Sequence, residues 1–166
     1  SSQHPYIRSN DEWFLNCSDK SVLIYKTDSK ARFQNSRYYF KKGIVVPMVK
    51  SSKINATLIE SRVFDQSLVG IFPFNQDYLL YLLALLNSDI IKKIINTINP
   101  TVNNSANYLK KIPIIIPDNN TLLIINCKVE KIIDNCKSNN LDEINKIQND
   151  LDSIITSLYQ YSFHNE

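Results

Sequence analysis

Residues 98–117 read INPTVNNSANYLKKIPIIIP and join two apolar parts of the chain. Before them, residues 76–98 are rich in Leu and Ile, and their spacing predicts a core helix with one apolar face. Pro100 ends that helix, because proline disfavours the helical conformation in the residue before it. The polar residues 99–111 then form a loop, which leads into the extended segment 112–117. A loop of Asn, Thr and Lys between two apolar elements is suited to contact with a polar polymer.

The chain after Pro117 shows a different pattern, in which apolar residues recur at alternating steps of three and four. Such heptad spacing predicts two helices, each with one apolar stripe. The turn at 137–140 is too short for anything except an antiparallel return, so residues 121–162 should form a helical hairpin. The residues expected in its seam are Leu122, Ile125, Val129, Ile132 and Cys136 on the first helix, and Ile144, Ile147, Leu151, Ile154, Leu158 and Tyr161 on the second.

Residues 21–74 hold short segments rich in Val, Ile and Tyr that are separated by polar turns, which is typical of β-strands. They predict a small, mostly antiparallel sheet. Pro47 cannot donate a backbone hydrogen bond, so its strand is expected at an edge of the sheet or with a bulge. The four expected strands are SVLIY at 21–25, GIVVPMV at 43–49, INATLI at 54–59 and SLVGIF at 67–72.

These patterns together predict an α+β fold: a small, mostly antiparallel sheet with a core helix, followed by a C-terminal antiparallel helical hairpin. Residues 1–118 are expected to form the first domain. Residues 119–166 are expected to form the hairpin, packed on that domain or on the rest of a larger parent protein. A parent is expected because the opening residues SSQHPY lack an initiator Met.

The composition limits the class of protein. With 166 residues and 43% hydrophobic content, the chain can bury a core. Its longest apolar run, residues 78–86, is shorter than the roughly 20 residues that cross a bilayer, so no membrane partner is expected. Three cysteines without a CxxC pair are typical of reduced thiols, and the expected location is the cytoplasm.

Positive charge is concentrated in one part of the chain. Residues 19–62 hold ten Lys or Arg against Asp19, Asp28 and Glu60, a local net charge of +7 that leaves −4 for the remainder. This distribution is typical of a protein that binds a polyanion. The alternative is that these lysines only solubilise exposed strand edges.

The residue types that carry most enzyme chemistry are scarce. Only Gly43 and Gly70 occur, so no glycine-rich loop can cradle a nucleotide cofactor. The two histidines, His4 and His164, stand near the ends of the chain, which argues against histidine catalysis and most metal sites. We therefore expect no catalytic residue, no metal and no cofactor in this chain.

Several pieces in a fixed order resemble a known family. They are WFLN at 13–16, YYFKKGI at 38–44, FD at 64–65, IFP at 71–73, LLNS at 85–88, NPT at 99–101 and KIP at 111–113. Together they are similar to the TaqI-like C-terminal specificity domain attached to adenine-N6 DNA methyltransferases of restriction-modification systems. The resemblance implies a target recognition domain, which reads duplex DNA while a catalytic domain of the same polypeptide flips and methylates an adenine.

The resemblance also implies what the parent is. A type II enzyme that carries nuclease, methyltransferase and recognition parts in one polypeptide is the usual parent, and its catalytic domain is expected to bind S-adenosylmethionine. The present chain is expected to be inert alone, because Asn99-Pro100-Thr101 is not the Asn/Asp-Pro-Pro-aromatic motif of an adenine methyltransferase. Abundant Asn, Ile and Lys with little Gly are typical of an AT-rich genome, which fits a bacterial source.

Charge and resemblance lead to one set of candidate DNA-binding residues. Basic side chains can neutralise phosphates and position the protein, whereas compact polar side chains can read base edges. An Asn can pair bidentately with adenine, although each Asn can equally serve its own loop. The neighbouring aromatic residues 38–40 are expected to alternate between core and surface, with at most one exposed. The candidates are Arg37, Lys41, Lys42, Lys50, Lys53 and Arg62 for phosphates, and Ser51, Ser52, Asn55, Thr101, Asn103 and Asn104 for hydrogen bonds.

Two other functions fit parts of the pattern. Half of a type I specificity subunit would likewise place an extended segment and heptad helices after a recognition domain. A protein-interaction module would use the hairpin at 121–162 to dock a partner, and its basic segment would serve only solubility. Gene context distinguishes the first alternative, and a direct test of DNA binding distinguishes the second.

Overall fold

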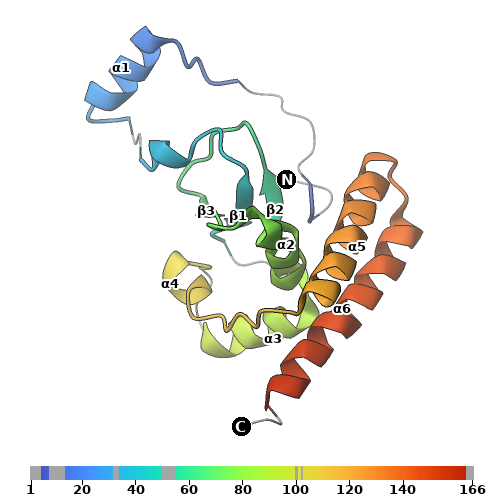
Figure 1. The fold of residues 1–166 in the computed structure, drawn as a ribbon. Coiled ribbons are helices and arrows are strands. Elements are labelled where there is room, and N and C mark those ends of the chain that lie inside the picture. Colours follow the sequence, from blue (N-terminus) through green and yellow to red (C-terminus); the bar gives the residue numbers. More distant parts are fainter. Residues whose placement is uncertain are drawn as a thin grey trace.

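The computed structural model describes residues 5–7, 14–31, 34–49, 55–99, 101 and 103–163, with side chains as far as residue 160. A three-stranded antiparallel sheet, two central helices and a C-terminal helical hairpin make up the body of the molecule (Figure 1). This arrangement confirms the α+β fold. In chain order the elements are α1 (Asp19–Thr27), the 3-10 turn η1 (Ser36–Tyr38), β1 (Gly43–Pro47), β2 (Thr57–Ile59), β3 (Leu68–Ile71), the 3-10 turn η2 (Gln76–Tyr78), α2 (Leu79–Asn87), α3 (Asp89–Ile98), α4 (Ala106–Leu109), α5 (Asn119–Lys137) and α6 (Leu141–Phe163).

β1 is the central strand of the sheet and pairs antiparallel with β2 and β3. Ile44 of β1 lies between Leu58 of β2 and Ile71 of β3. The prediction that Pro47 places its strand at an edge or in a bulge is therefore wrong, since β1 is central and its register with β3 is continuous. Pairing with β2 ends at Val45, so the N–H that proline lacks would point past the end of that neighbouring strand.

Residues 21–25, predicted as a strand, lie in helix α1 instead. Ser18 has the extended conformation of an N-cap, and its carbonyl oxygen accepts a hydrogen bond from the amide of Val22 at 2.9 Å. Asp19 in the first turn and Lys26 in the last turn have the charges that the helix dipole favours. A short apolar run does not by itself distinguish a strand from a helix. Figure 1 shows α1 apart from the sheet, and none of its residues is buried.

The single helix predicted for residues 76–98 is wrong in one respect, because two helices meet at Ser88. Ser88 is extended, with φ −75° and ψ 152°, and its hydroxyl oxygen accepts a hydrogen bond from the amide of Ile91 at 3.4 Å. Serine is a favoured N-cap residue, so α3 begins directly after it. α2 is mostly buried, whereas α3 buries one face through Ile91 and Ile95 and exposes Lys93.

α5 and α6 form the predicted antiparallel hairpin, and they pack on α2 and α3. Every residue predicted in the seam of α5 is buried. On α6 the predicted seam holds as far as Leu151, after which Ile155 and Tyr159 are buried, one residue beyond the predicted positions. The stripe shifts because a helix of 3.6 residues per turn drifts from a strict seven-residue repeat; the side chain of Tyr161 lies outside the described residues. Within the described part of the chain, no helix is long and apolar enough to cross a membrane.

Residues 5–7 join the sheet to the hairpin. The amide of Leu58 in β2 donates a hydrogen bond to the carbonyl oxygen of Tyr6 at 3.0 Å. The hydroxyl of Tyr6 donates to Oε1 of Gln148 on α6 at 2.5 Å, and burial raises the pKa of that hydroxyl. Because Tyr6 is fully buried, the sheet, the central helices and the hairpin share one hydrophobic core.

Candidate DNA-binding surface

The turn before β1 presents three exposed cations, Arg37, Lys41 and Lys42. In the same turn, the amide of Phe40 donates a hydrogen bond to the carbonyl oxygen of Arg62 at 2.9 Å. This bond connects the turn to the segment that follows β2, where Arg62 is half-buried. The structure thus brings together four of the predicted phosphate-binding residues at one end of the sheet.

An aromatic cluster of Tyr38, Tyr39, Phe64 and Phe72 lies beneath this turn. The ring of Tyr38 stacks on Phe72 with centroids 4.8 Å apart and an interplanar angle of 19°. Phe64 lies 5.8 Å from Phe72 and meets the ring of Tyr39 edge-on, also at 5.8 Å. Gly43 permits this approach, because a Cβ there would lie 2.5 Å from Cδ1 of Phe72. The cluster therefore gives the turn a packed apolar base, and such aromatic pairs stabilise by about 0.5–1.5 kcal/mol beyond the area they bury.

The aromatic cluster also orients two of the cations. The guanidinium carbon of Arg37 lies 4.8 Å from the ring centroid of Tyr38, and Nζ of Lys41 lies 5.8 Å from it. A cation over an aromatic face gains about 0.5–1 kcal/mol at an exposed site. Arg37 and Lys41 are therefore held near the surface of the cluster with their charges facing solvent.

The prediction that at most one residue of the aromatic run at 38–40 is exposed is confirmed, but the expected alternation between core and surface is not found. Tyr38 and Tyr39 are half-buried, whereas Phe40 is 56% exposed. Burial, followed by the negative charge of Asp65, raises the pKa of Tyr39, so its hydroxyl stays protonated and donates to the carbonyl oxygen of Gln34 at 3.0 Å. Phe40 has φ 62°, a left-handed conformation that bulky residues rarely adopt. The hydrogen bond from the amide of Phe40 to the carbonyl oxygen of Arg62 helps to hold this conformation.

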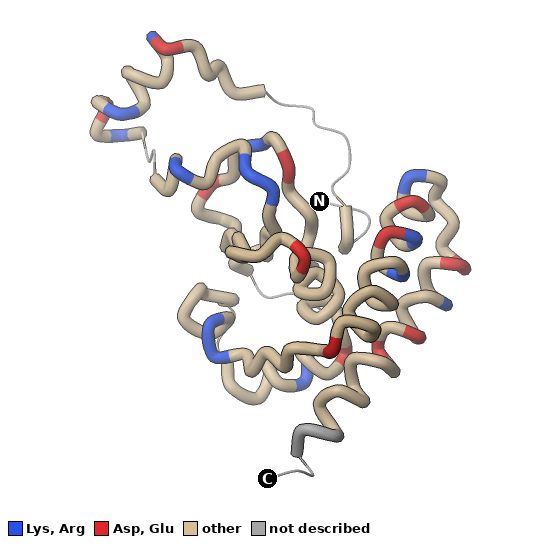
Figure 2. Tube along the Cα trace, viewed as in Figure 1, with Lys and Arg blue, Asp and Glu red and all other residues tan. Residues whose placement is uncertain are grey.

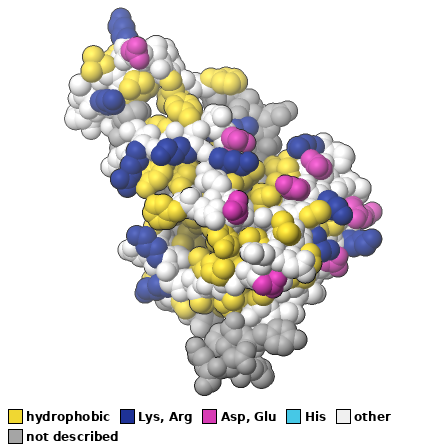
Figure 3. Space-filling view, in the orientation of Figure 1, with side chains coloured by type: hydrophobic (Ala, Val, Ile, Leu, Met, Phe, Trp, Pro, Cys, Tyr) yellow, Lys and Arg dark blue, Asp and Glu magenta, His cyan; other side chains and the backbone are white. Residues whose placement is uncertain are grey.

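Charge on the surface is distributed as the sequence indicates. Figure 2 shows more blue than red along α1 and along the loops near the sheet, whereas blue and red occur side by side along α5 and α6. In the space-filling view, dark blue side chains form a band across the face that is shown, with yellow side chains below it (Figure 3). The loops near the sheet are therefore the more electropositive part of the described molecule.

A hollow of about 630 Å³ lies directly beside the lysines of this band. Lys41 and Lys42 form its rim, and Phe74 and Leu80 are part of its apolar wall. Phe74 is fully exposed at the mouth of the hollow. The wall is apolar and the rim is cationic, an arrangement that suits contact with a sugar-phosphate backbone. Among the residues that the structure describes, no group of three or more His, Cys, Asp or Glu could hold a metal ion.

The second predicted element, the loop after α3, is held together by Asn99. Its Oδ1 accepts hydrogen bonds from the amide of Thr101 at 3.0 Å and from the hydroxyl of Thr101 at 2.7 Å. Its Nδ2 donates to the carbonyl oxygen of Asn103 at 3.0 Å. Asn99 is fully buried, whereas Thr101 and Asn103 are exposed. The loop is therefore held by the buried Asn99 and presents Thr101 and Asn103 at its surface.

Asn104 attaches this loop to the end of β1. Its amide donates a hydrogen bond to the carbonyl oxygen of Met48 at 2.6 Å, and its Nδ2 donates to that of Pro47 at 3.4 Å. An isolated bridge between Val49 and Asn103 continues the attachment. Asn104 is only 2% exposed. Its side chain serves the attachment of the loop in this structure, and the loop surface beyond it is formed by Thr101 and Asn103.

The predicted residues thus fall into two groups at opposite ends of β1. Lys41 and Lys42 precede the strand, and the attachment to Asn103 follows it. A five-residue strand is roughly 17 Å long at about 3.3 Å per residue. The major groove of B-DNA is about 12 Å wide, so the two groups are far enough apart to reach opposite sides of one groove.

The remaining candidates lie between these two groups in the sequence. Lys50, Ser51, Ser52 and Lys53 lie outside the described residues. Asn55 precedes β2 and is half-buried. For these five residues, a contact with DNA stays a prediction.

The structure also presents polar and basic residues that the sequence reasoning did not select. Gln34 and Asn35 are exposed in the turn before β1, and Lys110 and Lys111 are exposed at the end of α4. Nζ of Lys111 lies 5.5 Å from the ring centroid of Tyr108. The lysine pair lies within the polar loop predicted at 99–111, so its position in the sequence could have identified it. For Gln34 and Asn35 the sequence has no comparable signal.

Comparison with known proteins identifies the family of the chain. No curated protein matches the chain. The family model of the TaqI-like C-terminal specificity domain matches residues 9–114, which include the sheet, the central helices, the turn with its cations and the loop that Asn104 attaches. Because this match covers more than half of the chain, the protein belongs to the family of TaqI-like C-terminal specificity domains, and it is a target-recognition module of restriction-modification.

Proposed function

We propose that this domain selects the duplex DNA sequence at which a bacterial, cytoplasmic restriction-modification enzyme methylates adenine at N6. The observation that carries the proposal is the position of Arg37 and Lys41 over the ring of Tyr38, with Lys42 next in the chain and the backbone of Arg62 bonded to the same turn, within the residues that match a specificity domain. Four cations at one end of a sheet would lose self-repulsion on contact with a polyanion. Duplex DNA has the required charge density.

The two ends of β1 have different roles in this proposal: one end contacts phosphates, and the other offers hydrogen-bonding groups. Arg37, Lys41 and Lys42 contact phosphates and fix the orientation of the domain on the duplex. The loop with Thr101 and Asn103 offers exposed hydrogen-bonding groups at the other end of β1, far enough away to reach the opposite side of one major groove. The loop is attached to β1 by the bonds of Asn104, so it keeps a fixed distance from the cations.

The chemistry of methylation belongs to another part of the parent in this proposal. A catalytic domain of the same polypeptide would bind S-adenosylmethionine and receive the flipped adenine. The present chain would contribute binding and would be catalytically inert alone. Residues 1–118 would be the recognition domain, and the hairpin at 119–166 would support it by packing on α2 and α3.

Selection of binding sites from a library of random duplexes tests the proposal. The chain is mixed with the library at low salt, the bound duplexes are recovered and amplified, and the cycle is repeated. One short, reproducible sequence motif is the expected result. Enrichment of no motif, or failure to retain any duplex, would contradict the proposed function and would favour a protein-interaction role for the hairpin.

A further inference from the structure

We propose that a hollow between the turn before β1, strand β3 and helix α4 reads one A·T base pair from the major groove. The inference rests on the proposed function and deepens it, because it assigns a base preference to a particular place on the surface. The hollow lies beside the cation turn but is distinct from the one that Lys41 and Lys42 line.

The hollow has a polar rim and an apolar floor. Its volume is about 390 Å³. The rim carries the side-chain amides of Gln34, Asn35 and Gln66, and the floor includes Phe64 and Phe72. The amides of the rim can form hydrogen bonds, and the apolar floor can contact a methyl group. An A·T pair presents both kinds of group in the major groove. Adenine offers N7 and the N6 amino group, and thymine offers O4 and a methyl group.

The floor is suited to a methyl group and not to a stacked base. The ring of Tyr38 has Phe72 stacked on it and the guanidinium of Arg37 4.8 Å from its centroid, so it already has two partners. Gly70 lines the hollow and has no side chain to fill it. A Cβ at Gly70 would lie 2.7 Å from Cε2 of Phe72 and 3.0 Å from Cζ of Phe64. The rings of Phe72 and Phe64 therefore pack directly on Gly70 and give the hollow an apolar floor that a methyl group would contact.

The rim is suited to adenine. Asn35 is exposed and has φ 59°, a left-handed conformation at the residue that precedes η1. Within the described residues, its side chain makes no capping hydrogen bond to η1. Gln34 beside it is also exposed. The hydroxyl of Tyr39 donates to the backbone carbonyl of Gln34, so that bond does not use the side-chain amide. Asn and Gln amides are the side chains that pair bidentately with N6 and N7 of adenine.

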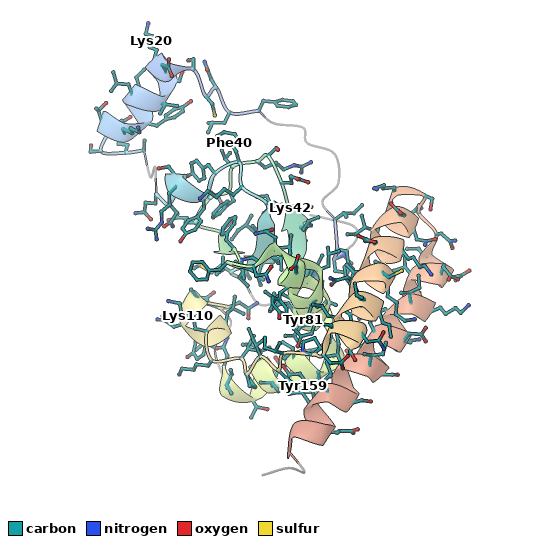
Figure 4. All side chains as sticks on the ribbon, viewed as in Figure 1. Lys20, Phe40, Lys42, Tyr81, Lys110 and Tyr159 are labelled. Atoms are coloured by element: carbon teal, nitrogen blue, oxygen red, sulfur yellow. The ribbon has the colours of Figure 1, made fainter. Side chains whose placement is uncertain are left out.

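Cations flank the hollow on two sides. Arg37 lies next to Tyr38 on one rim. Ala106 of α4 also lines the hollow, and Lys110 follows it by one helical turn, with its amide bonded to the carbonyl oxygen of Ala106 at 3.0 Å. Residues four apart lie on the same face of a helix. Lys110 is exposed and lies beside α4 in Figure 4, away from the hairpin. A base pair in the hollow would thus have a cation near each strand of its backbone.

The test compares site selection by the wild-type chain with selection by Gln34→Ala, Asn35→Gly and the double variant. Glycine at position 35 retains access to the positive φ, so the variant removes the amide without straining the turn. Asn145→Ala, on the exposed side of α6, is the matched control. Circular dichroism establishes that each variant is folded.

We expect the double variant to keep the motif except at one A·T position, where the preference over the other base pairs falls by about tenfold or more. In the wild-type motif, uracil in place of the thymine at that position should weaken binding severalfold, because it lacks the methyl group, and 7-deazaadenine should weaken it because it lacks N7. The 7-deazaadenine replacement should have little effect on the double variant, which lacks the amides, whereas the uracil replacement should still weaken its binding because the floor is unchanged. A motif that the double variant selects unchanged would overturn the inference while leaving the proposed function intact. A wild-type chain that selects no motif would overturn both.

Discussion

The guanidinium of Arg37 lies 4.8 Å from the ring centroid of Tyr38, and the same ring stacks on Phe72, which directly follows β3. One aromatic side chain therefore connects the core of the domain to the cation that is expected on DNA. The position of the charge depends on packing below the ring as much as on the turn that carries Arg37.

Replacing Tyr38 with Ala should lower both stability and DNA affinity, because the stack on Phe72 and the support of Arg37 are lost together. Loss of a half-buried aromatic side chain costs about 2–4 kcal/mol in the free energy of unfolding. Tyr38→Phe keeps the ring and should change either quantity little. Urea unfolding and anisotropy with a duplex measure the two effects. An alanine variant with wild-type affinity would show that Tyr38 does not position the cation.

Asn99→Ala should destabilise the domain, because the three hydrogen bonds by which this buried side chain holds the loop are lost. The expected loss in the free energy of unfolding is about 1–3 kcal/mol. Asn103→Ala is the matched control, since its bonds use the backbone carbonyl and its side chain is exposed. That change should cost less than about 0.5 kcal/mol. Equal losses in urea unfolding would contradict the structural role given to Asn99.

The seam of the hairpin offers a similar comparison. Ile125 is fully buried, so Ile125→Ala should lower the free energy of unfolding by about 2–5 kcal/mol through lost contacts and a cavity. Leu123, two residues earlier on α5, is 68% exposed, and Leu123→Ala should have an effect within about 0.5 kcal/mol. Should the two variants lose equal stability, α5 would not pack through the face described.

Stability should fall at alkaline pH because of the buried tyrosines. Tyr159 donates a hydrogen bond to the carbonyl oxygen of Pro113, and burial raises its pKa to about 12; burial also raises the pKa of Tyr81, which donates to the carbonyl oxygen of Ile115. Figure 4 shows both residues inside the molecule, near the hairpin. An unfolded tyrosine loses its proton near pH 10. Between about pH 10 and 12, the unfolded state therefore binds fewer protons than the folded state, and stability decreases as pH rises.

This stabilisation is fully present below about pH 9. Tyr159→Phe cannot ionise, so its stability should be lower at neutral pH, from the lost hydrogen bond, but should fall less steeply above pH 10. Thermal unfolding followed by circular dichroism across pH 8–11 tests the slopes. Parallel curves for the two proteins would rule out Tyr159 as a source of the decline.

Periodic parts of the fold could be predicted from the sequence, and parts decided by single residues could not. The heptad spacing of α5 identified its buried face because burial and period are directly linked. The helix at 21–25 and the break at Ser88 depend on N-caps, which are single polar residues that occur equally in loops. The apolar runs beside these caps are too short for their periodicity to distinguish a helix from a strand or to locate the end of a helix.

The candidate surface divides in the same way. Arg37, Lys41 and Lys42 are close in sequence, so charge counting located them. The approach of Arg62 depends on the hydrogen bond of its carbonyl with Phe40, and the approach of α4 to Gln34 depends on the path of the chain after α3. Such contacts between distant segments follow from packing, for which one sequence offers no local signal.

The most direct measurement of DNA recognition is fluorescence anisotropy of a labelled mixed-sequence duplex, titrated with the chain from about 50 to about 200 mM salt. Binding by the wild-type chain should weaken log-linearly with salt, and Lys41→Ala with Lys42→Ala should reduce the magnitude of the slope by about 2, since each phosphate contact contributes about 0.9. Lys131→Ala with Lys146→Ala, two exposed lysines of the hairpin, should leave the slope unchanged. A salt-dependent slope that falls only in the first double variant is the predicted result. The same slope in all three proteins, or no binding by the wild-type chain at the lowest salt, would contradict it.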